Sequence, residues 1–134
     1  MERLTHFKMS WDDPAQTILL LEYMPNWTWD QYFEGVRWIL QQSIDRRIAI
    51  HVVSINNYRT TAFPRGDFFG PAREYFPRLV KNGCTVTYIR PTAAIRALIA
   101  IYTRISPDAA AFVSIADSVE EARVWIHAHN TRPA

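Results

Sequence analysis

Two kinds of hydrophobic pattern alternate along the chain. Short apolar runs rich in aliphatic and β-branched residues predict strands. These runs lie at 4–9, 17–23, 48–55, 84–89 and 111–115. Between them, apolar residues recur at steps of three and four, a spacing typical of amphipathic helices. The helical patterns lie at 28–44, 67–82, 93–105 and from 118 onward.

These patterns follow one another in the order β-β-α-β-α-β-α-β-α. Turn-forming residues at 12–16 separate the first two strands, which predicts a hairpin. A helix separates each later pair of strands, which predicts parallel pairing through right-handed crossovers. We therefore expect one α/β domain over residues 1–134, with a mostly parallel mixed sheet of about five strands and four helices.

Local signals mark several helix ends. Thr28 with Gln31, and Ser118 with Glu121, have the spacing of a capping box, in which each side chain satisfies a backbone donor of the other residue. An Asn-Gly pair at 82–83 predicts a left-handed end to the second helix. Pro77 lies inside that helix and is expected to bend it.

Composition and charge narrow the class of protein. With 134 residues, 49% of them hydrophobic and 21% charged, the chain is suited to a single folded core. The net charge is only +2 and the arginines are scattered, so nucleic acid is not an expected partner. No apolar stretch reaches the roughly 20 residues needed to span a bilayer, and no secretory signal begins the sequence. We expect a cytoplasmic protein.

Few residues suggest site chemistry. Cys84 is the single cysteine, so it forms neither a disulfide nor a thiolate zinc site within one chain, and we expect it to be packed. The four histidines are dispersed, and His51 is expected to be a core or half-buried side chain with its polar atoms satisfied. No nucleophile elbow, GxGxxG or Walker sequence occurs. The sequence therefore predicts no catalytic residues, no metal site, no cofactor and no enzyme activity.

The carboxyl ends of parallel strands are where open α/β sheets usually bind ligands. Polar residues gather at these predicted ends and form a candidate ligand or partner loop: Asn56, Asn57, Arg59, Thr60 and Arg90. Arg90 and the backbone amides after Thr92 suit an anion. The alternative is a helix cap at Thr92 beside a solvated arginine, and Thr is common at caps.

The element order and one short segment resemble the STAS domain, the fold of anti-sigma-factor antagonists. The segment is Phe112-Val113-Ser114-Ile115-Ala116-Asp117-Ser118-Val119-Glu120-Glu121-Ala122. The resemblance extends over roughly residues 17–128. It implies a STAS-like α/β fold and a regulatory role exerted through contact with another protein.

The family's switch motif is altered in this chain. Antagonists carry Asp-Ser-Ser-Gly at the start of the helix after the third strand, and phosphorylation of the second serine releases the partner. The matching window here is Asp67-Phe68-Phe69-Gly70, in which two phenylalanines replace both serines. The resemblance therefore does not carry the phosphorylation switch to this position. A relocated phosphosite at Ser54, Thr60 or Thr61 is an alternative.

The helix predicted at 93–105 has apolar residues on more than one face. A helix that is apolar nearly all round must be covered on a second side, by another subunit, a protein partner or a lipid. The alternative is a wide core stripe with some apolar surface. The interaction candidates are Ile95, Leu98, Ile99, Ile101, Tyr102 and Ile105.

These observations favour a non-enzymatic protein-interaction or regulatory module of STAS-like type, with a protein partner or with self-association as a homodimer. A carrier of a small apolar ligand or lipid is the alternative. In that case, aromatic residues would line a pocket instead of filling a core: Trp27, Trp29, Trp38, Phe68, Phe69 and Tyr75. An enzyme that uses the strand-end loop ranks last.

Overall fold

The computed structural model describes residues 7–56 and 64–130. The loop candidates Asn57, Arg59 and Thr60, and the alternative phosphosite Thr61, lie outside the described residues. Ten elements are described, in the order β1 (Phe7–Trp11), β2 (Ile18–Tyr23), α1 (Trp29–Arg46), β3 (His51–Asn56), α2 (Phe69–Lys81), β4 (Thr85–Ile89), α3 (Ala93–Ile105), α4 (Ala109–Phe112), β5 (Val113–Ala116) and α5 (Val119–Asn130).

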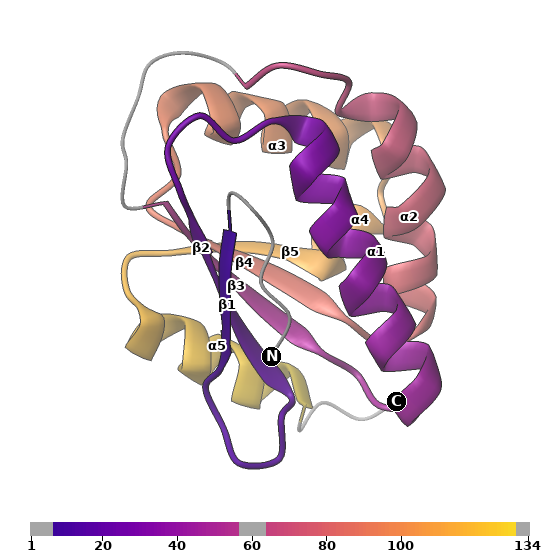
Figure 1. The fold of residues 1–134 in the computed structure, drawn as a ribbon, viewed down its shortest axis with the longest axis vertical. Helices are drawn as coiled ribbons and strands as arrows, with labels where there is room; N and C mark the ends of the chain where they lie inside the picture. Colours follow the sequence, from indigo (N-terminus) through magenta and orange to yellow (C-terminus); the bar gives the residue numbers. More distant parts are fainter. Residues whose placement is uncertain (1–6, 57–63, 131–134) are drawn as a thin grey trace.

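The strands form one mixed sheet in the order β1-β2-β3-β4-β5 (Figure 1). β1 and β2 form an antiparallel hairpin, and every other neighbouring pair is parallel. The register places Leu21, Ser54 and Tyr88 side by side across β2, β3 and β4. The predicted α/β architecture with a mostly parallel mixed sheet is confirmed.

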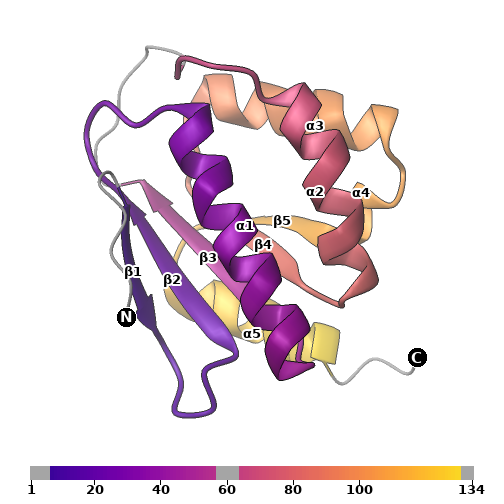
Figure 2. The same cartoon turned by 45° about the vertical axis from the view of Figure 1, so that its right-hand side comes forward.

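The helices cover the sheet unequally. A large aromatic and aliphatic core joins one face of the sheet to α1, α2, α3 and α4. A smaller core joins the other face to α5 through Ile18, Val53, Ala122 and Ile126. Figure 2 shows α5 on the opposite side of the sheet from α1 and α2. The fold is thus three-layered, with a single helix in the third layer.

The predicted capping boxes are found with one difference. Thr28 Oγ1 accepts from the Gln31 backbone, and Gln31 Oε1 accepts from the Thr28 backbone. Ser118 Oγ accepts from the Glu121 backbone, but the Glu121 carboxylate accepts from the backbone N–H of Asp117 instead of Ser118. Both helices therefore begin where the sequence predicts.

Three predicted strand boundaries are wrong by two residues or more. The strand expected to end at residue 9 extends to Trp11. The strand expected at 111–115 begins only at Val113, because the preceding alanines form the short helix α4. Alanine has the highest helix propensity, and the apolar pattern alone did not separate the two states. The strand expected at 48–55 begins at His51, because the N–H of Ile48 still bonds to Ser43 O at the end of α1.

Candidate functional site

The helix α3 lies beside the N-terminal ends of α1 and α2 (Figures 1 and 2). Thr92 Oγ1 caps it by accepting from the Ile95 backbone at 3.4 Å, so the predicted cap is present. Tyr102 fixes its inner side: its ring lies 5.4 Å from that of Phe76 and 5.8 Å from that of Phe68, measured between centroids. The Tyr102 hydroxyl donates to Ala72 O at 3.5 Å, and burial raises its pKa. One stripe of α3 is therefore anchored to α2.

The six interaction candidates on α3 separate into three groups. Leu98 and Tyr102 are buried in the core. Ile95 and Ile99 are half-buried and pack against it. Ile101 is 47% exposed and Ile105 is 65% exposed. The accessible apolar flank of α3 consists of these last two residues with Ala97, which is also exposed.

The charged residues of α3 are all basic. Arg96 and Arg104 are exposed, and the helix contains no acidic residue. Arg104 lies in the last turn, where a positive charge interacts favourably with the carbonyl end of the helix. No ion pair of Arg104 is found within the described residues. The apolar flank therefore has a cation beside it that is not neutralised by the described part of the chain.

A pocket adjoins the C-terminal end of this flank. It has a volume of about 70 Å³ and lies between α2, α3 and α4. Its aromatic floor includes Phe76 and Phe112, whose ring centroids are 5.2 Å apart. Asp108 lies at its exposed rim. The lining residues are Phe76, Pro77, Val80, Tyr102, Ser106, Asp108, Ala109 and Phe112.

Sequence reasoning missed this pocket. Its walls come from three helices, and one of them, α4, was expected to be a strand. The single local signal is the segment Ser106-Pro107-Asp108, which indicates only that α3 ends. The pocket arises from tertiary packing, which no spacing in the sequence encodes.

The strand-end candidates have visible structural roles. Asn56 ends β3 and is half-buried, and Arg90 follows β4 with its side chain exposed. Arg90 adopts a left-handed backbone with φ 44°, and its N–H bonds to Ala116 O at 2.9 Å. That bond continues the pairing between β4 and β5. The Thr92 cap belongs to the same segment.

A buried hydroxyl cluster lies beneath the same end of the sheet. The hydroxyls of Tyr32 and Tyr88 are 3.0 Å apart. Burial raises the pKa of Tyr88 to about 12, and burial also raises the pKa of Tyr23 and of Tyr32 well above the usual 10. Ser54 Oγ is buried and has no hydrogen-bond partner of good geometry within the described residues, although its polar contact with Tyr23 acts to lower the pKa of that tyrosine. The cluster is enclosed by the core.

The segment Asp67-Phe68-Phe69-Gly70 has a structural role at the start of α2. Asp67 Oδ2 accepts from the Gly70 backbone at 3.2 Å at the start of α2. A Cβ on residue 70 would collide with that carboxylate, so glycine suits the position. Phe68 is buried against Trp29, with ring centroids 4.9 Å apart, and Phe69 is half-buried beside it. Phe68 therefore anchors the start of α2 to α1, and Phe69 packs beside it.

The histidine and the cysteine considered as candidate site residues are part of the packed core. His51 is buried, and its Nδ1 lies 2.7 Å from Thr85 Oγ1, as expected of a core histidine with a hydrogen-bond partner. Cys84 is buried and donates to Ser43 Oγ at 3.3 Å. Within residues 7–56 and 64–130, no group of three metal-binding side chains comes together. In the same residues, no helix combines the length and hydropathy that a membrane span requires.

Two other hollows bear on ligand binding. An interior cavity of about 20 Å³, lined by apolar side chains including Leu21 and Cys84, has room for about one water. A groove of about 400 Å³ between α1 and α2 is open to solvent. Its lining mixes aromatic rings with charges of both signs: Asp30, Phe33, Arg37, Gly70, Pro71, Glu74 and Tyr75.

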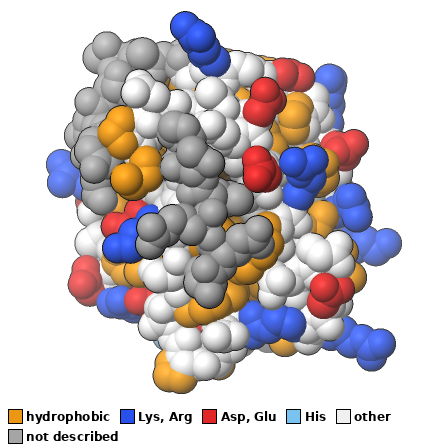
Figure 3. All heavy atoms as spheres, viewed as in Figure 1, with side chains coloured by type: hydrophobic (Ala, Val, Ile, Leu, Met, Phe, Trp, Pro, Cys, Tyr) orange, Lys and Arg blue, Asp and Glu red, His pale blue; other side chains and the backbone are white. Residues whose placement is uncertain are grey.

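The surface over α1 and α2 carries both signs of charge. Figure 3 shows acidic, basic and hydrophobic side chains interspersed on this face, without a field of one sign.

Comparison with models of known protein families, with curated proteins and with solved structures gave no match to this chain.

Proposed function

We propose that this chain is a non-enzymatic protein-interaction module of STAS-like type, which pairs with a second copy through the exposed flank of α3. The observation that carries the proposal is the exposure of Ile101 and Ile105 on a helix that Leu98 and Tyr102 anchor in the core. The element order on which the resemblance to STAS domains rests is also the order of the folded chain.

The free energy of burying apolar side chains favours association through the exposed flank of α3. Complete burial of an isoleucine side chain is worth roughly 1.5–3 kcal/mol relative to full exposure. Because Ile101 and Ile105 are largely exposed in the single chain, much of this burial free energy would be gained only on association. In a symmetric dimer both copies would contribute these two residues. Arg96 and Arg104 keep the flank hydrated and suit the polar rim of a modest interface.

The carrier hypothesis receives less support. A drug-sized ligand occupies a concave pocket of roughly 300–1,000 Å³. The interior cavity beside Cys84 holds about 20 Å³, and the groove of about 400 Å³ is open and carries three charged residues. Trp27, Trp29 and Phe68 pack edge to face against neighbouring rings. Such packing suits a core better than a ligand pocket.

Light scattering over a range of protein concentrations tests the proposal. We expect a dimer for the native chain and a folded monomer for the double variant Ile101→Glu/Ile105→Glu, with circular dichroism to confirm folding. The matched control is Val124→Glu on α5, because Val124 is 69% exposed and lies on another surface. The control should remain dimeric. A native chain that stays monomeric at high concentration, or a double variant that stays dimeric, would contradict the proposal.

A further inference from the structure

We infer that Ile105 of each copy inserts into the pocket between α2, α3 and α4 of the other copy, and that Arg104 of each copy pairs with Asp108 of the other. The inference rests on the proposed function, because it names how the α3 flank would engage a second chain. It defines a binding site for one aliphatic side chain with a carboxylate at its rim.

The side chain and the pocket match in size and character. Ile105 is the most exposed residue of the flank at 65%. The pocket holds about 70 Å³, and its walls are mostly apolar, with Phe76, Val80 and Phe112 among them. A small, partly open pocket of this kind suits an anchor side chain and is far below the size needed for a drug-sized ligand.

Both parts of the contact lie at the C-terminal end of α3. Ser106 lines the pocket and follows Ile105 directly in the chain. In a two-fold dimer, the same patch meets itself, so that residue i of one copy contacts residue j of the other and the reverse. A projecting side chain next to a receiving pocket has this self-complementarity. The arrangement therefore favours a second copy over an unrelated partner.

Charge supports the same occupant. Arg104 precedes Ile105, and Asp108 lies at the rim of the pocket. Both side chains are exposed, and neither forms an ion pair within the described residues. When Ile105 enters the partner's pocket, its neighbour Arg104 is brought toward the carboxylate at that pocket's rim. Each copy thus supplies one cation and one anion, and two reciprocal pairs form per dimer.

A charge exchange measured by sedimentation equilibrium tests the pairing. We expect Arg104→Asp and Asp108→Arg each to weaken dimerisation about tenfold, because each places like charges together twice per dimer. The combined variant Arg104→Asp/Asp108→Arg should return to within about threefold of the native dissociation constant. Asp108 makes no side-chain cap bond to α4, so its replacement removes no hydrogen bond there.

Two further variants test the pocket. Ile105→Ala removes the anchor, and Val80→Phe narrows the pocket from its half-buried wall. We expect each to weaken dimerisation at least tenfold. A dimer that tolerates all these changes yet dissociates with Ile101→Glu/Ile105→Glu would overturn this contact and leave the proposed function standing. A native chain that is monomeric throughout would overturn both.

Discussion

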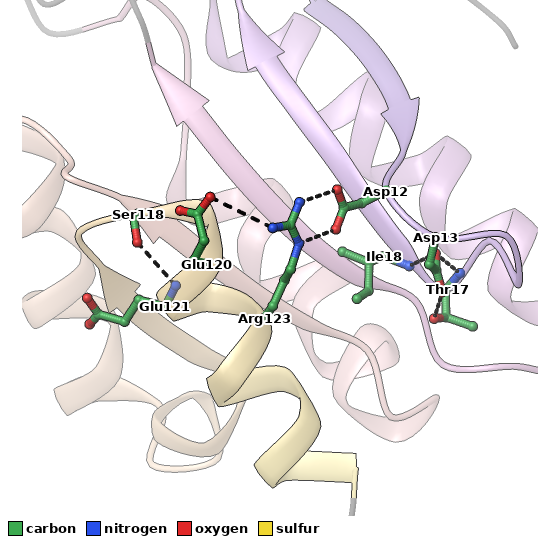
Figure 4. Close-up of polar contacts among 8 residues, drawn as sticks. All are labelled: Asp12, Asp13, Thr17, Ile18, Ser118, Glu120, Glu121 and Arg123. Atoms are coloured by element: carbon green, nitrogen blue, oxygen red, sulfur yellow. Dashed lines mark hydrogen bonds and ion pairs between the residues drawn. The ribbon is translucent and has the colours of Figure 1, made fainter.

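Arg123 on α5 and Asp12 in the turn between β1 and β2 form a two-point ion pair across 111 positions of sequence (Figure 4). The Nε–Oδ2 and Nη2–Oδ1 distances are both 2.7 Å. The side-chain hydrogen bond from Arg123 holds the pKa of Asp12 below its ordinary value of 3.8. This contact ties the single helix of the third layer to the hairpin at the edge of the sheet.

The ion pair predicts a pH-dependent stability. Because the pKa of Asp12 is lower in the folded than in the unfolded chain, its contribution is present above the unfolded value of 3.8 and is lost as the pH falls through the folded value. We expect urea denaturation to show Asp12→Asn less stable than the native chain at about pH 7, with a smaller difference at about pH 2.5.

The matched control for Asp12→Asn is Glu120→Gln. Glu120 also faces Arg123, but at 3.9 Å and with its side chain 79% exposed. We expect little effect at either pH, because exposed ion pairs contribute little. If Glu120→Gln destabilised the fold as much as Asp12→Asn, the loss of stability would be explained by the local charge in general and not by the specific pair of Asp12 and Arg123.

Asp13 is predicted to fix the hairpin turn. Its carboxylate accepts from the backbone N–H groups of Thr17 and Ile18, both at 2.9 Å, and from the Thr17 hydroxyl. Burial acts to raise the pKa of Asp13, but these hydrogen bonds outweigh burial and lower it. We expect Asp13→Ala to lower the free energy of unfolding by about 1–3 kcal/mol, since it strands backbone donors. Thr17→Val should cost less in the same denaturation experiment, because both backbone bonds survive.

Local sequence signals predicted the elements whose ends depend on local chemistry. α3 spans Ala93–Ile105, the predicted range, because a threonine cap starts it and a Ser-Pro segment follows it. The capping box at Thr28 likewise placed the start of α1. Such signals act through hydrogen bonds between residues three or four positions apart, so they are visible in the sequence.

Contacts between distant segments were not predictable in this way. The ion pair between Asp12 and Arg123, the bond between Tyr32 and Tyr88, and the pocket beside Asp108 each require the folded arrangement. The apolar excess of α3 was visible in the sequence, but which of its residues face the core was not. Leu98 and Ile101 are both aliphatic and three positions apart, and only the packing on α2 distinguishes them.

The buried tyrosines predict a cooperative alkaline transition. The folded pKa values of Tyr23, Tyr32 and Tyr88 lie above the unfolded value of 10. Their contribution to stability is therefore complete below that value and is lost as the pH rises through the folded values. We expect tyrosinate absorbance from these residues to rise together with loss of the circular dichroism signal. Ionisation of Tyr23, Tyr32 and Tyr88 at their unfolded value of 10 with the fold intact would contradict their burial.

Replacing the buried Ser54 is expected to cost little stability, which is unusual for a buried polar residue. Its hydroxyl has no hydrogen-bond partner of good geometry within the described residues, and its polar contact is with Tyr23, so Ser54→Ala removes a desolvated group at little cost in hydrogen bonding. We expect the free energy of unfolding to stay within about 0.5 kcal/mol or to rise. The control is Thr87→Val on β4, which loses the 2.8 Å bond to Ser114 and should destabilise. A loss of about 1 kcal/mol or more from Ser54→Ala would mean that the hydroxyl has a partner.

The segment Asp67-Phe68-Phe69-Gly70 makes the last prediction. Placing serine at position 68 or at position 69 should separate the roles of the two phenylalanines. Phe68 is buried between Trp29 and Tyr102, so Phe68→Ser creates a cavity and buries a hydroxyl there. We expect a loss of about 3–5 kcal/mol in urea denaturation.

Phe69→Ser is the matched comparison, because Phe69 is the neighbouring phenylalanine and is only half-buried. It loses less apolar contact, so we expect less than half the effect of Phe68→Ser. Equal losses would mean that Phe68 is no more important to the core than its neighbour. The expected difference would explain why serine at position 68 is incompatible with this core: the Phe68 ring joins the start of α2 to α1 and α3.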